Sequence, residues 1–286
     1  MFTTNKGVVG GITPLFITGV ITTVNECGEV IHMKEKLLEQ LKSLKGDVSF
    51  YYKNLITGEA IGFNEKIPLQ AASVIKIPIL IEAFLRISEG TIQKEDLFTI
   101  KKEDKLPSCG ALNYMHDDLN VTFEDLYTLM IILSDNTATN LLIKQLGMDK
   151  INYTMQNLGL KQTKLNRLLF DAKQSALGIE NYISAGEMGY LLEKMYFGEL
   201  ISPEASLEML RILKNQRLNG KIPFYIHGRA DIAHKTGEDD GITHDVGIVY
   251  APQPFVVCFC SNNVDVPVYE RLMQEVTLEL VEMQDK

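Results

Sequence analysis

The stretch "AASVIKIPIL", residues 71–80, opens a segment that is otherwise nearly all apolar and carries two polar side chains at its start. Ser73 and Lys76 lie three residues apart, so on a helix their side chains are neighbours. An unpaired ammonium is costly to bury, and Pro78 lacks the N–H that a helix interior needs. Residues 73–88 are apolar nearly all round, which is typical of a central helix. We therefore expect a buried helix that begins beside a cleft, with Pro78 tolerated because tertiary packing surrounds the helix.

The flanking segments predict an α/β (α+β) fold with a helical insert. Residues 48–63 alternate between apolar and polar side chains and indicate a β-hairpin, and three β-branched runs between residues 230 and 261 indicate strands. Cap residues such as Thr122, Ser184 and Ser202 predict helix starts between these two groups of strands. The simplest arrangement that fits this order is one sheet shared by the two terminal segments, with an all-helical part between them.

This arrangement sets the expected domain boundaries. An amphipathic helix begins near Met33, and a last one begins near Asp265. We expect a single domain over residues 33–286, in which 33–72 and 227–286 form the α/β layer and 73–226 form the helical part. Residues 1–32 contain an apolar run that glycine, threonine and proline interrupt, and it is too weak to predict a membrane helix or an export signal. We therefore expect these residues to be an extension that is disordered or that results from a wrongly assigned translation start.

Composition limits the partners. The chain has 286 residues, of which 45% are apolar, and a net charge of −9, so it can bury a full core and is not suited to nucleic acid or an anionic membrane surface. The four cysteines form no C-x-x-C pair, and we expect reduced thiols, buried at Cys258 and Cys260. No cofactor or metal is indicated, because His234 and His244 lack the spacing of zinc ligands. We expect a monomer with a small-molecule substrate and no firm membrane association.

Three short motifs carry chemistry. In S-x-x-K, a desolvated Lys76 has a lowered pKa and can take the proton of Ser73, which makes the hydroxyl a nucleophile. About one such motif is expected by chance in a chain of this length. The triplet Ser134-Asp135-Asn136 also suits an ordinary helix end, and Lys235-Thr236-Gly237 also suits the end of an edge strand. Each motif alone is therefore weak.

Together, in the order S-x-x-K, S-D-N and K-T-G, they form the set found in class A β-lactamases and penicillin-binding proteins. From about Gly46 to its end the chain resembles this serine hydrolase family, at spacings similar to those of class A enzymes. The resemblance implies an antiparallel five-stranded sheet flanked by helices, with an inserted all-helical subdomain.

The resemblance also implies residue roles. Ser73 would be the acylated nucleophile, Lys76 its proton acceptor, and Ser134, helped by Lys235, the group that protonates the leaving nitrogen. Asn136 would hold the substrate amide, and Lys235 and Thr236 its carboxylate. Gly237 lets a ligand approach the strand closely, and the N–H groups of Ser73 and Glu238 would form the oxyanion hole.

One departure concerns the loop that carries a deacylating glutamate in class A enzymes. In "LNRLLFDAKQSALGIEN", residues 165–181, Arg167 fits the pattern, but Leu169 stands at the position of the glutamate. A leucine cannot activate water. Asp171 and Glu180 are the candidate bases, although Asp171 also suits the surface and Glu180 also suits an ion pair with Arg167 across the neck of the loop.

A second departure follows the K-T-G motif, where His244 stands near the place of an arginine that helps to hold the substrate carboxylate. Acidic residues follow the motif, so we expect modest affinity for anionic penicillins unless Lys235 or Arg229 offsets their charge.

Three functions remain open at this stage. The first is a β-lactamase that deacylates slowly, the second a D-Ala-D-Ala carboxypeptidase or penicillin-binding protein, and the third a low-turnover binding module for β-lactams or peptidoglycan fragments. The weak export signal favours a cytoplasmic location and leaves an extracytoplasmic one open.

Overall fold

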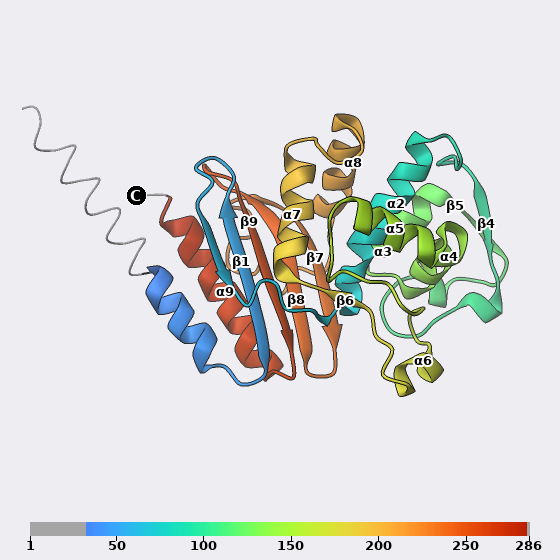
Figure 1. Cartoon of the computed structure of the whole chain (residues 1–286). Coiled ribbons are helices and arrows are strands. Elements are labelled where there is room, and N and C mark those ends of the chain that lie inside the picture. The colour runs from blue at the N-terminus through green and yellow to red at the C-terminus, as the bar shows by residue number, and fades with distance from the viewer. Residues whose placement is uncertain (1–32, 285–286) are drawn as a thin grey trace, which may run out of the picture. The chain divides into compact units, whose positions relative to one another are not determined.

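The computed structural model describes residues 33–284 (Figure 1). The chain divides into two compact units between Ser43 and Leu44. In the first unit a helix covers residues 33–43, as the sequence predicts. The expectation of an extension over residues 1–32 lies outside the described residues, and the assignment of 33–286 to one catalytic domain stays a prediction. Within the described part, no helix combines the length and the apolar character that a membrane crossing requires.

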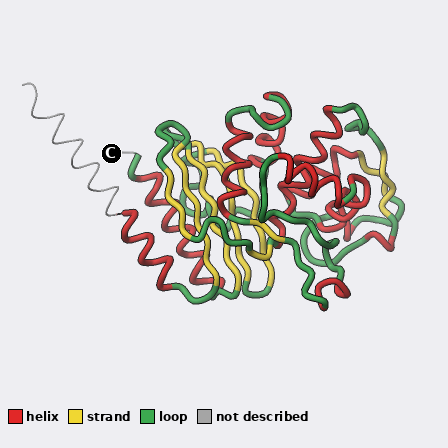
Figure 2. The backbone as a smooth tube through the Cα atoms, in the orientation of Figure 1, coloured by secondary structure: helices red, strands yellow, loops and turns green. Residues whose placement is uncertain are grey.

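The second unit is built on a five-stranded antiparallel sheet, shown in yellow in Figure 2. Its strand order is β2-β1-β9-β8-β7, so strands from the two ends of the chain pair in one sheet, as predicted. The β1–β9 pairing places Phe50 opposite Phe259. The strands are β1 (Asp47–Asn54), β2 (Ala60–Phe63), β7 (Asp231–Asp239), β8 (Ile242–Tyr250) and β9 (Phe255–Asn262).

Alternation along β1 and β9 supplies two buried faces. On one face the Phe50 and Phe259 ring centroids lie 5.1 Å apart, and Phe259 contacts Tyr269 of α9 (Val266–Glu282). Tyr51 and its partner Cys258 point to the other face, which α7 (Ala185–Tyr196) covers. Burial raises the pKa of the Cys258 thiol well above its usual value, and the thiol is free, as predicted.

The helical part follows β3 (Leu69–Gln70). Thr122, Ser184 and Ser202 each accept a hydrogen bond from a backbone N–H in the first turn of the following helix, which confirms the predicted starts. The remaining helices are α2 (Lys76–Ser88), α3 (Phe123–Ile132), α4 (Asn136–Leu146), α5 (Met148–Asn157), α6 (Ala172–Ala176) and α8 (Pro203–Lys214), and the short strands are β4 (Leu97–Ile100), β5 (Leu119–Thr122) and β6 (Tyr182–Ile183). In Figure 1, α7 lies beside the sheet, and α2, α3, α4 and α5 lie farther from it, while α8 contacts both α7 and the edge strand β7.

The buried central helix begins differently from the prediction. Residues Ala72–Ile75 form a 3₁₀ turn, and the α-helix α2 starts only at Lys76. Pro78 is therefore the third residue of α2, within its first turn, where proline is tolerated best, and it is buried together with its neighbours Ile77 and Ile79.

The contact between α7 and the sheet generates a stability prediction. A Cβ on Gly189 would lie 2.3 Å from Cδ1 of Tyr51, so the helix can approach β1 only with glycine there. We expect Gly189→Ala to lower the free energy of unfolding by about 1–3 kcal/mol through overpacking. Denaturant unfolding measures this, and Gly220→Ala is the matched control because a Cβ at that position would meet no atom within 4 Å. Equal stability of the two variants would contradict the close approach.

Candidate active site

Ser73 and Lys76 meet as the S-x-x-K motif predicts. The Lys76 Nζ lies 2.9 Å from the Ser73 Oγ, at the junction of the 3₁₀ turn and α2. The side chain of Lys76 is fully buried. Its Nζ also lies within hydrogen-bond distance of the Ser134 carbonyl oxygen (2.7 Å), the Ser134 Oγ (2.9 Å) and the Asn136 Oδ1 (2.9 Å). Each of these acceptors is an uncharged oxygen.

The S-D-N triplet forms the link between α3 and α4. Ser134 has a φ of 54°, and Asp135 is the N-cap of α4, accepting from the N–H of Ala138. The other oxygen of Asp135 accepts from the N–H groups of Ala111 (2.7 Å) and Leu112 (2.8 Å). This buried carboxylate therefore fixes the turn and holds the loop before it against α4, which keeps Ser134 and Asn136 directed at Lys76.

The K-T-G motif completes the cluster from β7. The Lys235 Nζ lies 3.1 Å from the Ser134 Oγ and 2.7 Å from the Thr236 carbonyl oxygen. Gly237 follows, where a Cβ would lie 3.3 Å from the Ser73 backbone N and 3.0 Å from the His244 ring. The glycine thus lets β7 pack directly against the 3₁₀ turn, so that the Ser73 backbone lies beside the end of the strand.

Both buried lysines of the cluster have lowered pKa values. Burial, assisted by the nearby Lys235 ammonium, lowers the pKa of Lys76 well below its usual value. Burial also lowers the pKa of Lys235 to about 7; the Asp245 carboxylate opposes this shift, and Lys221 adds to it. An uncharged Lys76 amine can accept a proton from the Ser73 hydroxyl that it contacts.

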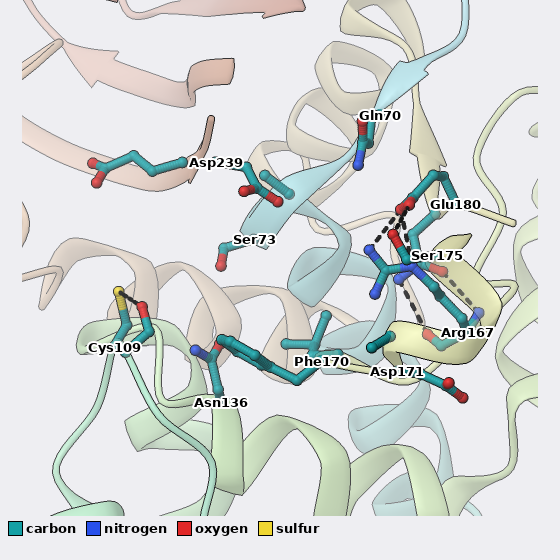
Figure 3. A pocket seen from close by; sticks show the side chains of 16 residues that line it. Gln70, Ser73, Cys109, Asn136, Arg167, Phe170, Asp171, Ser175, Glu180 and Asp239 are labelled. Atoms are coloured by element: carbon teal, nitrogen blue, oxygen red, sulfur yellow. Dashed lines mark hydrogen bonds and ion pairs between the residues drawn. The ribbon is translucent and has the colours of Figure 1, made fainter. Parts of the chain in front are cut away.

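Ser73 opens into a cavity of ≈ 600 Å³ (Figure 3). Asn136 and Cys109 line one side, and the strand end at Glu238 and Asp239 lines another. Figure 3 shows the Ser73 hydroxyl pointing into this space. The cleft therefore exposes the Ser73 hydroxyl, which contacts the buried Lys76, and Lys76 in turn contacts the buried Ser134.

The segment over residues 166–181 forms the opposite wall. Arg167 and Glu180 pair across its neck, with the Arg167 Nη2 2.6 Å from the Glu180 Oε2. Asp171 caps α6, accepting from the N–H of Gln174 at 3.1 Å, and points away from Ser73 in Figure 3. The structure thus brings neither candidate carboxylate to the nucleophile.

Leu169 is held at this wall by Asn140, which the sequence reasoning missed. The Asn140 Oδ1 accepts from the Leu169 N–H, and its Nδ2 donates to the Leu169 carbonyl, both at 2.9 Å. Asn140 lies one helical turn after Asn136, so the i, i+4 spacing within "SDNTATN" could have placed it on the same face.

Both histidines near the K-T-G motif have hydrogen-bond partners within the protein. The His234 ring contacts Asp245 Oδ1 (2.9 Å) and Asn219 Oδ1 (3.0 Å). The His244 Nδ1 accepts from the N–H of Ser261, so its Nε2 donates to the Gln70 carbonyl. Burial lowers the pKa of His244 to about 4, so at neutral pH it supplies no positive charge in place of the expected arginine.

The cation that does reach Glu238 is Lys221, which sequence reasoning also missed. It lies in a loop before β7, at 3.0 Å from the Glu238 Oε1. Arg229, which we considered as an offset to the acidic rim, contacts Glu282 at 3.4 Å. No periodicity or motif marks Lys221, because a loop residue paired across the fold leaves no local pattern.

Comparison with known proteins agrees with this geometry. A profile of the β-lactamase enzyme family matches residues 32–283. A β-lactamase from Sphaerobacter thermophilus has a similar structure, with a TM-score of 0.82 and 27% identity over 89% of this chain and 97% of that one. PBP-A has a TM-score of 0.80 and 27% identity over 88% of this chain and 95% of that one.

Among curated proteins, a β-lactamase from Rhodobacter capsulatus is 24% identical over 52% of each chain, so the match spans about half of that relative. Since the family profile covers most of its length, the chain belongs to the β-lactamase enzyme family. It is a serine hydrolase of that family, with the mixed α/β fold that its sequence predicts.

Proposed function

We propose that the protein opens β-lactam rings through an acyl-enzyme at Ser73. The contact that carries this proposal is the 2.9 Å approach of the Lys76 Nζ to the Ser73 Oγ. The Lys76 amine takes the hydroxyl proton as the Ser73 oxygen attacks the lactam carbonyl. The C–N bond then breaks, and Ser134 gives its proton to the leaving nitrogen while it receives one from Lys76, 2.9 Å away.

The remaining roles follow from position. The N–H groups of Ser73 and Glu238 form the oxyanion hole, which the close approach at Gly237 supports. Asn136 binds the substrate amide, and Thr236 and Lys235 bind its carboxylate. These assignments account for the polar residues that converge on the cavity.

We further propose that the acyl group leaves slowly. A general base must lie within hydrogen-bond reach of the water that it activates. Within residues 33–284, Leu169 holds the position expected for the glutamate, Asp171 caps a helix, and Glu180 binds Arg167. Acylation therefore has the groups that it requires close to Ser73, whereas deacylation lacks a positioned carboxylate among the described residues.

A specific observation favours a penicillin-binding protein as the second candidate. PBP-A is similar to this chain, and a variant of it with a leucine replaced by glutamate was solved as an acyl-enzyme complex with penicillin G. Slow release would suit a D-Ala-D-Ala peptidase or a low-turnover binding module as well as a slow β-lactamase. The candidate substrates are therefore β-lactams or acyl-D-Ala-D-Ala-like compounds.

Burst kinetics separate these functions. We expect a chromogenic cephalosporin to give a stoichiometric burst followed by slow turnover, and a fluorescent penicillin to label the wild type. Ser73→Ala should give neither signal because the nucleophile is gone. Rapid steady hydrolysis without a burst would contradict slow deacylation, and equal labelling of Ser73→Ala would refute the assigned nucleophile.

A gain-of-function substitution tests the missing base. Asn140 holds the backbone of Leu169, so we expect Leu169→Glu to present a carboxylate to the acyl-enzyme without displacing the wall. Deacylation of a penicillin should accelerate by about 10²-fold, the lower end for general-base catalysis. Leu169→Gln has a similar shape and no base, and it should deacylate at the wild-type rate. Equal acceleration by both variants would show that shape, and not the base, limits release.

The lowered pKa of Lys235 predicts that the acylation rate for an anionic β-lactam depends on pH. Lys235 carries its charge below a pKa of about 7 and loses it above, so binding of an anionic β-lactam weakens as pH rises. We expect the second-order rate constant for acylation by benzylpenicillin to fall by about tenfold between about pH 7 and 9. This fold-change corresponds to the loss of one charge-assisted hydrogen bond to the substrate carboxylate. Lys235→Arg keeps its charge and should remove the decline. A decline of the same size in that variant would assign it to another group.

A further inference from the structure

A short segment that the proposed reaction does not use joins the elements that carry the S-D-N and K-T-G motifs. Residues 216–219 follow α8 and form hydrogen bonds to the end of α3 on one side and to β7 on the other. None of these residues is among the described side chains that line the cavity at Ser73. We call residues 216–219 the bridging segment.

The bridging segment binds the carboxyl end of α3. The side chain of Gln216 is buried; its Nε2 donates to the Ile131 carbonyl oxygen at 2.9 Å, and its Oε1 accepts from the next two backbone N–H groups. The Arg217 N–H donates to the Ile132 carbonyl oxygen at 3.0 Å. Carbonyl groups in the last turn of a helix have no intrahelical partner, so the segment supplies donors that α3 lacks. Ser134 follows two residues after Ile132, so these contacts fix the chain where the S-D-N turn begins.

The bridging segment reaches β7 through Asn219. Its Oδ1 lies 3.0 Å from the His234 Nε2, and its Nδ2 donates to the Gln216 carbonyl oxygen at 3.3 Å. The other ring nitrogen of His234 lies 2.9 Å from Asp245 Oδ1 on the neighbouring strand, so the imidazole is held on both sides. Because His234 directly precedes Lys235, one amide side chain connects the K-T-G strand to the residue that binds α3.

We propose that Gln216 and Asn219 are positioning residues that set the separation between the S-D-N turn and β7. The atoms that depend on this separation are the Ser134 Oγ and the Lys235 Nζ, which lie 3.1 Å apart. Among the described residues, the Asp135 carboxylate accepts only from α4 and from the loop before it. The turn therefore needs a second support toward β7, and the bridging segment supplies it.

The inference rests on the proposed function in one respect, the transfer of a proton from Ser134 to the leaving nitrogen. When a β-lactam acylates Ser73, the C–N bond breaks and the nitrogen takes that proton, so a misplaced Ser134 slows the reaction. When a thiolester acylates Ser73, the C–S bond breaks and the sulfur leaves as a thiolate that needs no proton, while Lys76 keeps the proton of Ser73. Loosening the bridging segment should therefore slow the first reaction and spare the second.

Two substrates with the same phenylacetyl group test this. Benzylpenicillin has a nitrogen leaving group, and the phenylacetylglycyl thiolester of mercaptoacetate has a sulfur one. The measurement is the second-order rate constant for acylation, followed by stopped flow for the penicillin and by thiol release for the thiolester. We expect Asn219→Leu to lower the constant for the penicillin by about tenfold, the scale of one lost hydrogen bond, and that for the thiolester by less than about twofold.

Asn215→Leu is the matched control. Asn215 is exposed, as Asn219 is, but its Nδ2 donates to the Arg211 carbonyl oxygen within α8 and not toward β7. It should change both rate constants by less than about twofold, the usual range for a surface substitution. Thermal denaturation checks the fold of both variants, and Asn219→Ala replaces the leucine variant if that one unfolds. Equal falls with the two substrates, or no fall with the penicillin, would overturn the proposal.

A second background tests the route through Ser134. In Ser134→Ala the hydroxyl that the segment positions is gone, so adding Asn219→Leu should slow acylation by benzylpenicillin no further. If the loss of about tenfold persisted in this background, Asn219 would act on another group and the positioning role would be wrong.

Failure of the proposed function would look different from failure of this inference. Absence of labelling of the wild type by any β-lactam would refute the acyl-enzyme at Ser73 and, with it, the role of the bridging segment. Normal labelling of the wild type, with penicillin and thiolester responding equally to Asn219→Leu, would keep the acyl-enzyme and remove only the positioning role.

Discussion

The burial of the Lys76 ammonium is the constraint on which the rest of the site depends. A buried cation is tolerated only when its protons meet acceptors, and here those acceptors are Ser73, Ser134 and Asn136, from two separate segments of the chain. Burial, assisted by the nearby Lys235 ammonium, lowers the pKa of Lys76, and none of these acceptors is a carboxylate that would hold its charge. Supplying acceptors to one lysine thus brings together Ser73, Lys76 and Ser134, the groups to which we assign the roles of nucleophile, base and proton relay.

Supporting contacts keep this cluster rigid. The Asp135 carboxylate accepts from three backbone N–H groups, which fixes the turn that carries Ser134. Gly237 lets β7 approach the 3₁₀ turn, which brings Lys235 to the far side of the Ser134 hydroxyl. The Ser134 hydroxyl therefore lies between the Nζ atoms of two lysines with lowered pKa values, a position suited to passing a proton in either direction.

The sequence predicted what leaves a local pattern. Alternation indicated the strands of the sheet, cap residues indicated the starts of α3, α7 and α8, and the three motifs marked the residues that converge on Lys76. It did not reveal the 3₁₀ turn at Ser73, because propensity cannot separate one turn of 3₁₀ from the first turn of an α-helix. It also missed the Asn140–Leu169 and Lys221–Glu238 contacts, since polar pairs across the fold depend on tertiary placement and follow no period.

The two halves of the proposed reaction lie on different parts of the fold. Acylation uses α2, β7 and the S-D-N turn, which are tied to one another through buried hydrogen bonds. Deacylation depends on the wall over residues 166–181, which is held by its own contacts at Arg167 and at Asn140. The Asn140 contacts fix the backbone of Leu169, and its side chain lines the cavity and packs against the core, so we expect a substitution there to change deacylation more than acylation. The lifetime of the acyl-enzyme can therefore be set by one side chain, independently of how fast it forms.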